Sequence, residues 1–200
     1  MALTLKRAVL STIALWIIFA WGYTFLMVGL GQLFFPHQAN GSVVRLGNRV
    51  IGARHVGQYF GNNPDYFWGR PSDTVSVATG KPQPYNAFAS APSNYGPTNA
   101  TLVQDIRGRI HQYLRSTPGL KVSQIPVSLV ESSGSGLDPD ITVQSAMIQI
   151  PRIAEHTHLS QETLRKLVQT HILAPDLGVL GPRRINVLLL NRALYQTLHP

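Results

Sequence analysis

The sequence predicts an α+β protein in which one N-terminal transmembrane helix precedes a single mixed α/β domain outside the cytoplasm. Three observations support this fold class. A long apolar run lies near the N-terminus, helical and strand-like patterns alternate after it, and a long irregular stretch rich in aromatic residues lies between them. The 200 residues are enough for one domain and an appendage.

Composition excludes several classes of protein. The chain has 17 Lys and Arg against 9 Asp and Glu, a net charge of +8, but only 13% of its residues are charged and 44% are hydrophobic, so it is not a disordered chain. The absence of cysteine excludes disulfide scaffolds, thiolate metal sites and thiol catalysis. No basic run exceeds two residues, so we do not expect nucleic acid as a partner.

Residues 8–35 are predicted to form the transmembrane helix. These 28 consecutive residues carry no charge, and a bilayer core needs about 20 helical residues. The alternative, a cleaved signal peptide, has an apolar core of roughly 7 to 15 residues followed by a small-residue cleavage site. The run is too long for that, and its nearest candidate site, at Ala20-Trp21-Gly22, lies in the middle.

The flanking charges predict the orientation. Lys6 and Arg7 precede the span, whereas the first basic residue after it is Arg45. Because basic residues close to a span favour the cytoplasmic side, we expect residues 1–7 in the cytoplasm and residues 36–200 outside.

The span itself is predicted to be an anchor rather than a pathway. A single uncharged helix cannot enclose a pore or relay an ion, so the chain cannot transport alone. Gly22 and Gly29 are seven residues apart and so share one face, where another helix could approach closely. The alternative is that glycine is simply common in membrane helices.

Beyond the span, local patterns predict short helices and strands. Two β-branched runs around Gly47-Asn48 indicate a hairpin over 42–54. Leu102, Ile106 and Ile110 have helical spacing, with Thr98 or Asn99 as the N-cap. The remaining expected elements are strands over 125–130 and 184–190, the second of them central in a sheet, and helices over 100–115, 142–149, 160–173 and 191–198.

Residues 57–99 are predicted to form a long loop. This stretch of 43 residues holds 5 Gly, 6 Pro and 5 Asn, which prevents long regular elements, and also 8 of the chain's 17 aromatic residues. Because disordered segments contain few aromatic residues, we expect these rings to pack and to order the loop. Long ordered loops are often functional, but the rings could also only complete the core.

Catalytic and metal-binding patterns are weak. The Ser-Gly-rich stretch 132–138 lacks the Gly-Lys-Ser/Thr ending of a P-loop, and Ser133 stands where a nucleophile elbow at Ser135 needs glycine. A tight turn between a strand and a helix, with Asp138 or Thr142 as a cap, is the favoured interpretation. Glu155, His156, His158 and His171 have no recognised metal-ligand spacing, so we expect no metal site.

Several motifs occur in a fixed order behind the span. They are YFWGRPS at 66–72, NAFAS at 86–90, SNYGPTN at 93–99, SSGSGLDP at 132–139, LGVLG at 177–181 and RINVLLLN at 184–191. Together they resemble the C chain of the Kdp potassium-transporting ATPase over nearly the whole chain. The departures are local, at Ala91-Pro92, at Asp140 and at 172–175.

The resemblance implies an accessory subunit of a bacterial high-affinity potassium pump in the inner membrane. In that family a channel-like A chain conducts potassium, a P-type B chain hydrolyses ATP through an aspartyl phosphate, and a small F chain associates with them. The C chain is needed for assembly and activity. We assign no cofactor to this chain itself, and ATP and potassium are used by the complex. The family is also described as raising the affinity of the B chain for ATP, with a glutamine that corresponds to Gln149.

Charge and topology limit this role. ATP is cytoplasmic, whereas Gln149 is expected outside, so coupling through the membrane chains is the simpler account of any change in ATP affinity. Residues 36–200 carry 15 basic and 9 acidic residues, a charge of +6 that repels potassium, so the domain should act by contact. The partner contacts we expect in the loop are Tyr66, Trp68, Arg70, Asn86 and Asn94.

Two other functions remain open at this stage. One is a membrane-anchored outer enzyme that uses the turn at 132–138, for which Ser135 would be required. The other is an anchored catalytic chaperone that contacts ATP directly through Gln149.

Overall fold

The computed structural model describes residues 2–61 and 63–199. They form two units that divide between Val43 and Val44, and each is described by itself.

The first unit is dominated by one continuous helix, Leu3–Phe34, that is long and apolar enough to cross a membrane. It comprises α1 (Ala2–Trp16), a π-helical segment (Ile17–Tyr23) and α2 (Thr24–Phe34), and the short α3 (Pro36–Ala39) follows. The π-helical segment was not predicted. Along it Trp21 stacks on Phe25, with ring centroids 5.8 Å apart, and meets the edge of Trp16.

The second unit opens with the predicted hairpin, which is confirmed. Strands β1 (Val43–Leu46) and β2 (Arg49–Ala53) pair on either side of a two-residue turn. Gly47 has φ +57° there, a conformation that glycine adopts at no steric cost.

A three-stranded antiparallel sheet lies near the centre of this unit, in the order β3-β5-β4. Its strands are β3 (Asp140–Thr142), β4 (Ile172–Leu173) and β5 (Arg184–Asn186). The prediction of a strand over 184–190 is right for its central position but wrong beyond Asn186. That side chain accepts a hydrogen bond from the N–H of Leu189 at 3.1 Å, so the apolar run begins α8 (Val187–Leu198) instead.

The sequence-based predictions agree best with the structure at the helices that begin with a side-chain N-cap. Helix α4 (Ala100–Ser116) has the predicted cap Asn99, and α7 (Gln161–Thr170) has Ser160. The prediction for α7 is wrong at its C-terminal end, because the last residues pair with β5 as β4. Thr142 caps α5 (Val143–Met147), and α6 (Ile150–Thr157) was not predicted.

The predicted strand over 125–130 is wrong. Two 3₁₀ helices, Val122–Gln124 and Val127–Leu129, lie on either side of Ile125 and Pro126. Proline has no N–H to donate to a neighbouring strand, and the Leu129 side chain turns into the core, where it is 1% exposed.

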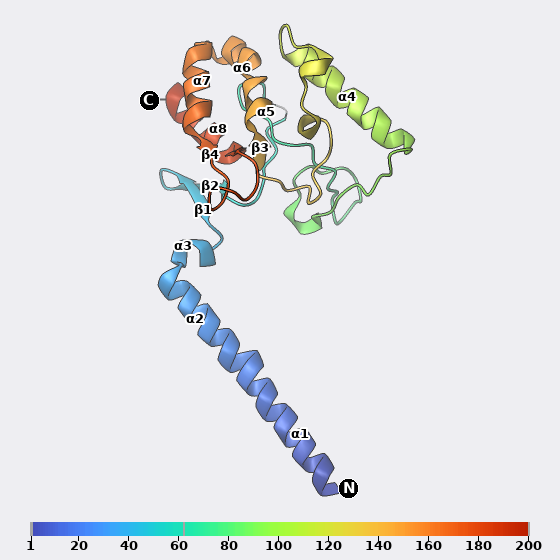
Figure 1. Cartoon of the computed structure of the whole chain (residues 1–200), viewed down its shortest axis with the longest axis vertical. Coiled ribbons are helices and arrows are strands. Elements are labelled where there is room, and N and C mark those ends of the chain that lie inside the picture. The colour runs from blue at the N-terminus through green and yellow to red at the C-terminus, as the bar shows by residue number, and fades with distance from the viewer. Residues whose placement is uncertain (1, 62, 200) are drawn as a thin grey trace. The chain divides into compact units, whose positions relative to one another are not determined.

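Two apolar clusters make up the core. The larger one lies among β3, β5 and helices α5 to α8 and includes Phe67; the smaller one joins Trp68, Tyr113 of α4 and Leu129. Figure 1 shows α5, α6, α7 and α8 gathered at one end of this unit and α4 at the other. Between Ala53 and α4 the described residues form only irregular structure, one 3₁₀ helix (Ala87–Ala89) and an isolated bridge between Val75 and Pro82.

Candidate functional site

The segment around Phe67 and Trp68 joins the two clusters of the core. Phe67, with 0% of its surface exposed, belongs to the larger cluster, and its neighbour Trp68, 7% exposed, belongs to the smaller one. Consecutive side chains of an extended segment point to opposite sides, so one dipeptide can enter both clusters. Its backbone groups are then buried and need partners.

Gln149 supplies the partners for Trp68. This residue lies between α5 and α6, where Pro151 follows as an early residue of α6, and none of its surface is exposed. Its Oε1 accepts from the N–H of Trp68 at 2.8 Å, and its Nε2 donates to the carbonyl of Trp68 at 3.1 Å and to that of Ser145 at 3.0 Å. The amide therefore takes the place that a neighbouring strand would have in a sheet.

Asn191 of α8 does the same for Phe67. Its Oδ1 accepts from the N–H of Phe67 at 2.9 Å, and its Nδ2 donates to the carbonyl of Phe67 at 2.9 Å. Gln149 and Asn191 come from different parts of the fold, and together they hold two consecutive residues of the irregular segment. We call this pair of amides the amide clamp.

Arg152 completes the clamp from α6. Its guanidinium lies over the Trp68 ring, 3.9 Å from the centroid, and donates to Gln149 Oε1 at 2.8 Å and to the carbonyl of Tyr66 at 3.0 Å. A third hydrogen bond reaches the carbonyl of Pro64. Burial lowers the pKa of Arg152 to about 10, so the side chain keeps its charge at neutral pH and holds the segment through cation–π attraction and hydrogen bonds.

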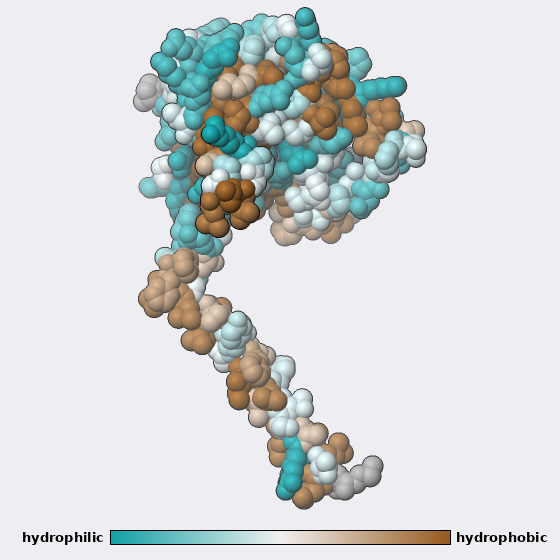
Figure 2. Space-filling view, viewed as in Figure 1, coloured by the Kyte–Doolittle hydropathy of each residue, from teal (hydrophilic) through white to brown (hydrophobic). Residues whose placement is uncertain are grey.

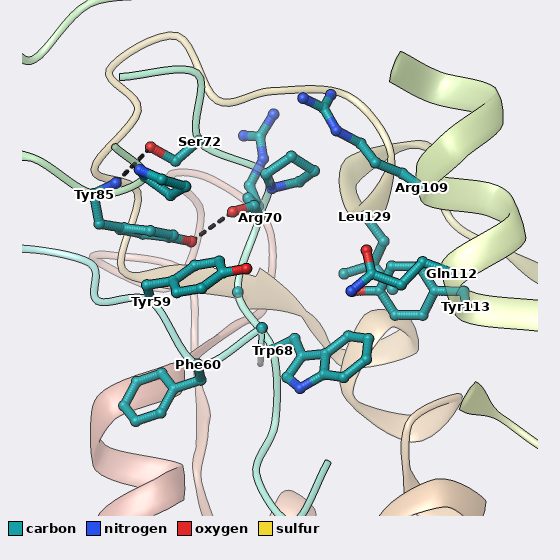
Figure 3. A pocket seen from close by; sticks show the side chains of 14 residues that line it. Tyr59, Phe60, Trp68, Arg70, Ser72, Tyr85, Arg109, Gln112, Tyr113 and Leu129 are labelled. Carbon is teal, nitrogen blue, oxygen red and sulfur yellow. Dashed lines mark hydrogen bonds between the residues drawn. The ribbon is translucent and has the colours of Figure 1, made fainter. Parts of the chain in front are cut away.

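A cavity of about 230 Å³ lies on the smaller cluster. Figure 3 shows Tyr59, Trp68, Tyr85 and Tyr113 around it, with the arginines Arg70 and Arg109 above. Burial raises the pKa of Tyr85 and of Tyr113 above the ordinary range of tyrosine, and the Asp138 carboxylate adds to the shift at Tyr85. Both hydroxyls therefore stay protonated at neutral pH.

The two arginines at the cavity are already paired. Arg70 donates to Asp138 at 3.0 Å, and Arg109 donates to Asp73, to Ser132 at 2.9 Å and to the carbonyl of Val130 at 2.9 Å. These bonds connect the irregular segment with α4 and with the Ser-Gly-rich turn. The cavity thus offers aromatic faces and neutralised guanidinium groups.

The Ser-Gly-rich turn at 132–138 is built against the irregular segment. The N–H of Ser133 donates to the carbonyl of Pro71 at 3.0 Å, and the hydroxyl of Ser90 donates to the carbonyl of Ser135 at 2.9 Å. Gly136 has φ +67°, and a Cβ added there would lie 2.4 Å from Thr74 Cγ2. The predicted position between a strand and a helix is wrong, since the turn connects a 3₁₀ helix to β3.

The predicted contact residues fall into two groups. The structure brings Tyr66, Trp68 and Gln149 together at the amide clamp, whereas Arg70 lines the nearby cavity and pairs with Asp138. Asn86 and Asn94 lie elsewhere. The side chain of Asn86 caps the 3₁₀ helix and donates to the carbonyl of Val75 at 2.7 Å, while Asn94 is exposed with φ +56°.

In the first unit Gly22 and Gly29 are exposed, and a Cβ added at either one would meet nothing within 4 Å. Gly22 lies in the π-helical segment and Gly29 in α2. Among the described residues no three or more His, Asp or Glu side chains gather as candidate metal ligands.

Sequence reasoning identified Arg152 as the basic residue beside Gln149 but missed its structural role, and it missed Asn191 and the pair of Arg109 with Asp73. A signal was present for Asn191, which is an amide within the apolar run VLLLNRAL, where a polar side chain has to find a buried partner. No comparable pattern marks Arg109 and Asp73, which are 36 residues apart.

Comparison with known proteins gives a family. The model of "K+-transporting ATPase, c chain" matches residues 5–196. The chain belongs to the KdpC family. It is 40% identical over 195 residues, 95% of each chain, to the potassium-transporting ATPase KdpC subunit of Methylobacterium nodulans. It is 44% identical to that of Methylococcus capsulatus, over 86% of each chain. The KdpC subunit of Caldanaerobacter subterraneus is 35% identical, over 96% of this chain and 94% of that one.

Membership of the KdpC family makes the chain an accessory subunit of a potassium pump, as the motifs in the sequence predicted. Several of these motifs build the clamp and its surroundings. The motif at 66–72 supplies Phe67 and Trp68, and the motif at 184–191 supplies both the cap of α8 and Asn191.

Proposed function

We propose that the chain is a non-catalytic, single-pass subunit that assembles with the other chains of the pump and stabilises them. Residues 1–7 lie in the cytoplasm, residues 8–35 cross the inner membrane, and residues 36–200 form a domain on its outer side. The partners are the channel-like A chain, the P-type B chain and the small F chain, together with the lipid bilayer.

The observation that supports this proposal is the set of hydrogen bonds made by the polar side chains at the centre of the domain. Gln149, Asn191 and Arg152 are all buried, and their hydrogen bonds join them to the protein's own backbone or to one another. Such groups fix a shape and leave no reactive atom for a substrate. A domain of this kind acts through its surface, by contact with other chains.

The same hydrogen bonds limit how Gln149 could contact ATP. Gln149 has two acceptor and two donor positions, and Trp68, Arg152 and Ser145 fill all four. A nucleotide could bind this amide only by replacing one of those partners. We therefore propose that any effect on ATP affinity passes through the membrane chains, by favouring one conformation of the pump over another.

Topology provides the first test, because the chain has no cysteine. Gln169→Cys, at an exposed position of α7, should react with an impermeant thiol reagent in intact spheroplasts. Thr4→Cys is the matched control and should react only after the membrane is permeabilised. A reactive residue 4 with a protected residue 169 would reverse the orientation and remove the basis of the proposal.

Assembly provides the second test. Detergent extraction should yield one stable complex that contains this chain, and deletion of the chain should reduce the recovery of the A and B chains together. Labelling of the assembled complex with an ATP photoprobe should mark the B chain. Labelling of this chain that is lost in Gln149→Glu would favour direct nucleotide binding instead.

A further inference from the structure

The cavity between α4 and the irregular segment contains hydrogen-bond donors that the chain itself does not use. Tyr113 is only 4% exposed, and its hydroxyl has no hydrogen bond to another residue that the structure describes. The Nε of Arg70 is buried and also lacks an acceptor among the described residues. Most buried donors in folded proteins have partners, so two unused donors at one cavity indicate that another molecule supplies the acceptors.

These donors reach the cavity from two sides. Figure 3 shows Gln112 and Tyr113 extending from α4 toward Tyr59, with Arg70 at the upper rim. The Gln112 amide is exposed and makes no hydrogen bond within the described part of the chain. Because burial raises the pKa of Tyr113, its hydroxyl keeps its proton at neutral pH and can donate. An occupant therefore meets donors on α4 and on the irregular segment.

Ring faces and prolines make up much of the remaining lining. Tyr59, Trp68 and Tyr85 line the cavity together with Pro71 and Pro84. Its volume of about 230 Å³ is far larger than the roughly 30 Å³ that one water molecule takes in the liquid. The cavity therefore has room for a flat or prolyl group that carries oxygen acceptors.

The charges at the cavity cancel. Arg70 pairs with Asp138 at 3.0 Å, and Arg109 pairs with Asp73. A lining without net charge attracts neither an anion such as a nucleotide nor a cation such as potassium. The occupant that fits is therefore uncharged.

An extended peptide segment has this chemistry. In the polyproline II conformation the backbone makes no internal hydrogen bonds, so every carbonyl is available to donors outside the segment. Grooves lined by aromatic side chains are one of the recurring ways in which proteins bind such segments. The rings match the side chains of the segment, and the unused donors match its carbonyl groups.

Helix α4 leaves surface for such a contact. Tyr113 is the one buried residue of this 17-residue helix. Figure 2 shows apolar groups on the surface over α4, between hydrophilic ones. Apolar surface beside a cavity with unused donors is typical of a site that another chain covers.

We propose that this cavity receives an extended, uncharged segment of another chain of the pump. The carbonyl groups of the segment accept from Tyr113, Arg70 and Gln112, and its side chains pack on the aromatic rings. This inference rests on the assembly with other chains proposed above, and it names a surface through which that assembly is made.

Photocrosslinking of the assembled pump tests the inference. A diazirine amino acid of about the length of glutamine replaces Gln112, which is exposed. After irradiation of the purified complex we expect a covalent adduct with a segment of the A, B or F chain, identified by peptide mass spectrometry. Val103, which is exposed and about opposite on α4, is the control position and should give about fivefold less adduct.

Tyr113→Phe tests the hydroxyl separately. The change removes a group that has no partner in the described part of the chain, so the isolated chain should keep its free energy of unfolding at pH 8. In the complex, labelled Tyr113→Phe chain should exchange with excess unlabelled chain about tenfold faster, because one buried hydrogen bond to the partner is lost. Tyr95→Phe, at an exposed tyrosine, is the control and should exchange at the parent rate.

Four results would overturn the inference: no protein adduct at position 112, equal adducts at positions 112 and 103, an adduct with lipid or a small molecule alone, and exchange of Tyr113→Phe at the parent rate. The last result would leave water as the partner of the hydroxyl. These experiments begin with a recovered complex that contains this chain. Failure to recover it contradicts the proposed function, whereas recovery with any of the four results contradicts this inference alone.

Discussion

Gln149 and Trp68 are joined by a reciprocal pair of hydrogen bonds, 2.8 and 3.1 Å long, although they are 81 residues apart in the sequence. The amide replaces the neighbouring strand that the Trp68 backbone would otherwise need. Asn191 repeats the arrangement on Phe67. The two halves of the core are therefore held together by side-chain amides rather than by a continuous sheet.

Gln149→Ala should lower the free energy of unfolding by about 3 kcal/mol, because it leaves the N–H and carbonyl of Trp68 buried without partners. Urea unfolding of the full chain in detergent, followed by circular dichroism, measures this change. Gln169→Ala, at an exposed glutamine of α7, is the control and should stay within about 0.5 kcal/mol. A variant that keeps full stability but raises the KM of the pump for ATP would contradict the structural role.

Asn191→Ala should lower the free energy of unfolding by a similar amount. The loss in the double variant with Gln149→Ala should be smaller than the sum of the two single losses. Both amides hold the same segment, so once one is lost the other has less to stabilise, and we expect a coupling energy of about 1 kcal/mol in a double-mutant cycle. Gln196→Ala is the matched control on α8, where the side chain is exposed. Strict additivity would mean that the two amides act independently.

Stability should fall at alkaline pH because of Tyr85 and Tyr113. In the unfolded chain both ionise near pH 10, whereas burial raises their folded pKa. The stabilisation is therefore complete below about pH 10 and is lost as the pH rises toward the folded values, by about 1.4 kcal/mol for each tyrosine at pH 11. Urea unfolding from pH 8 to 11 measures the slope.

Tyr113→Phe keeps the ring in the core and removes one of these two protons, so the alkaline slope should be halved. Tyr85→Phe should also halve the alkaline slope. Its free energy of unfolding at neutral pH should be lower as well, because the Tyr85 hydroxyl donates to the carbonyl of Arg70. An unchanged slope in the double variant would show that other groups control the alkaline transition.

Gly22→Leu with Gly29→Leu should weaken the association of the chain with the other subunits about tenfold, if small residues let a partner helix approach closely. The helix itself tolerates both changes, because an added Cβ meets no atom within 4 Å. Co-purification from detergent measures the effect. Thr24→Leu, about opposite on the helix, is the control. Equal recovery of both variants would leave the glycines without a packing role.

The elements that the sequence predicted well depend on nearby residues. The hairpin follows from Gly47-Asn48, and α4 and α7 begin at the side-chain caps Asn99 and Ser160. Each of these signals lies within a few positions of the element that it starts. The prediction of a strand over 125–130 was wrong because it gave more weight to the apolar pattern than to Pro126, although the proline was visible in the sequence.

The candidate site could be predicted only in part. The motif residues Tyr66, Trp68 and Gln149 lie together as one cluster, but their expected role as surface or nucleotide contacts gave no indication that Trp68 and Gln149 are buried. Asn86 caps a 3₁₀ helix and Arg70 forms an ion pair, which no spacing in the sequence indicates. The side chain of the exposed Asn94 donates to the carbonyl of Pro92, two residues away.

The sequence by itself determined the long apolar helix, the hairpin, the capped helices and the family, because each depends on composition, local patterns or motif order. Tertiary structure alone decided that Ile172 and Leu173 form a strand, and that Gln149 and Asn191 hold the centre of the domain. The physical reason is distance along the chain. The partners of these amides lie 81 and 124 residues away, and a buried backbone group shows its need for a partner only after the chain has folded around it.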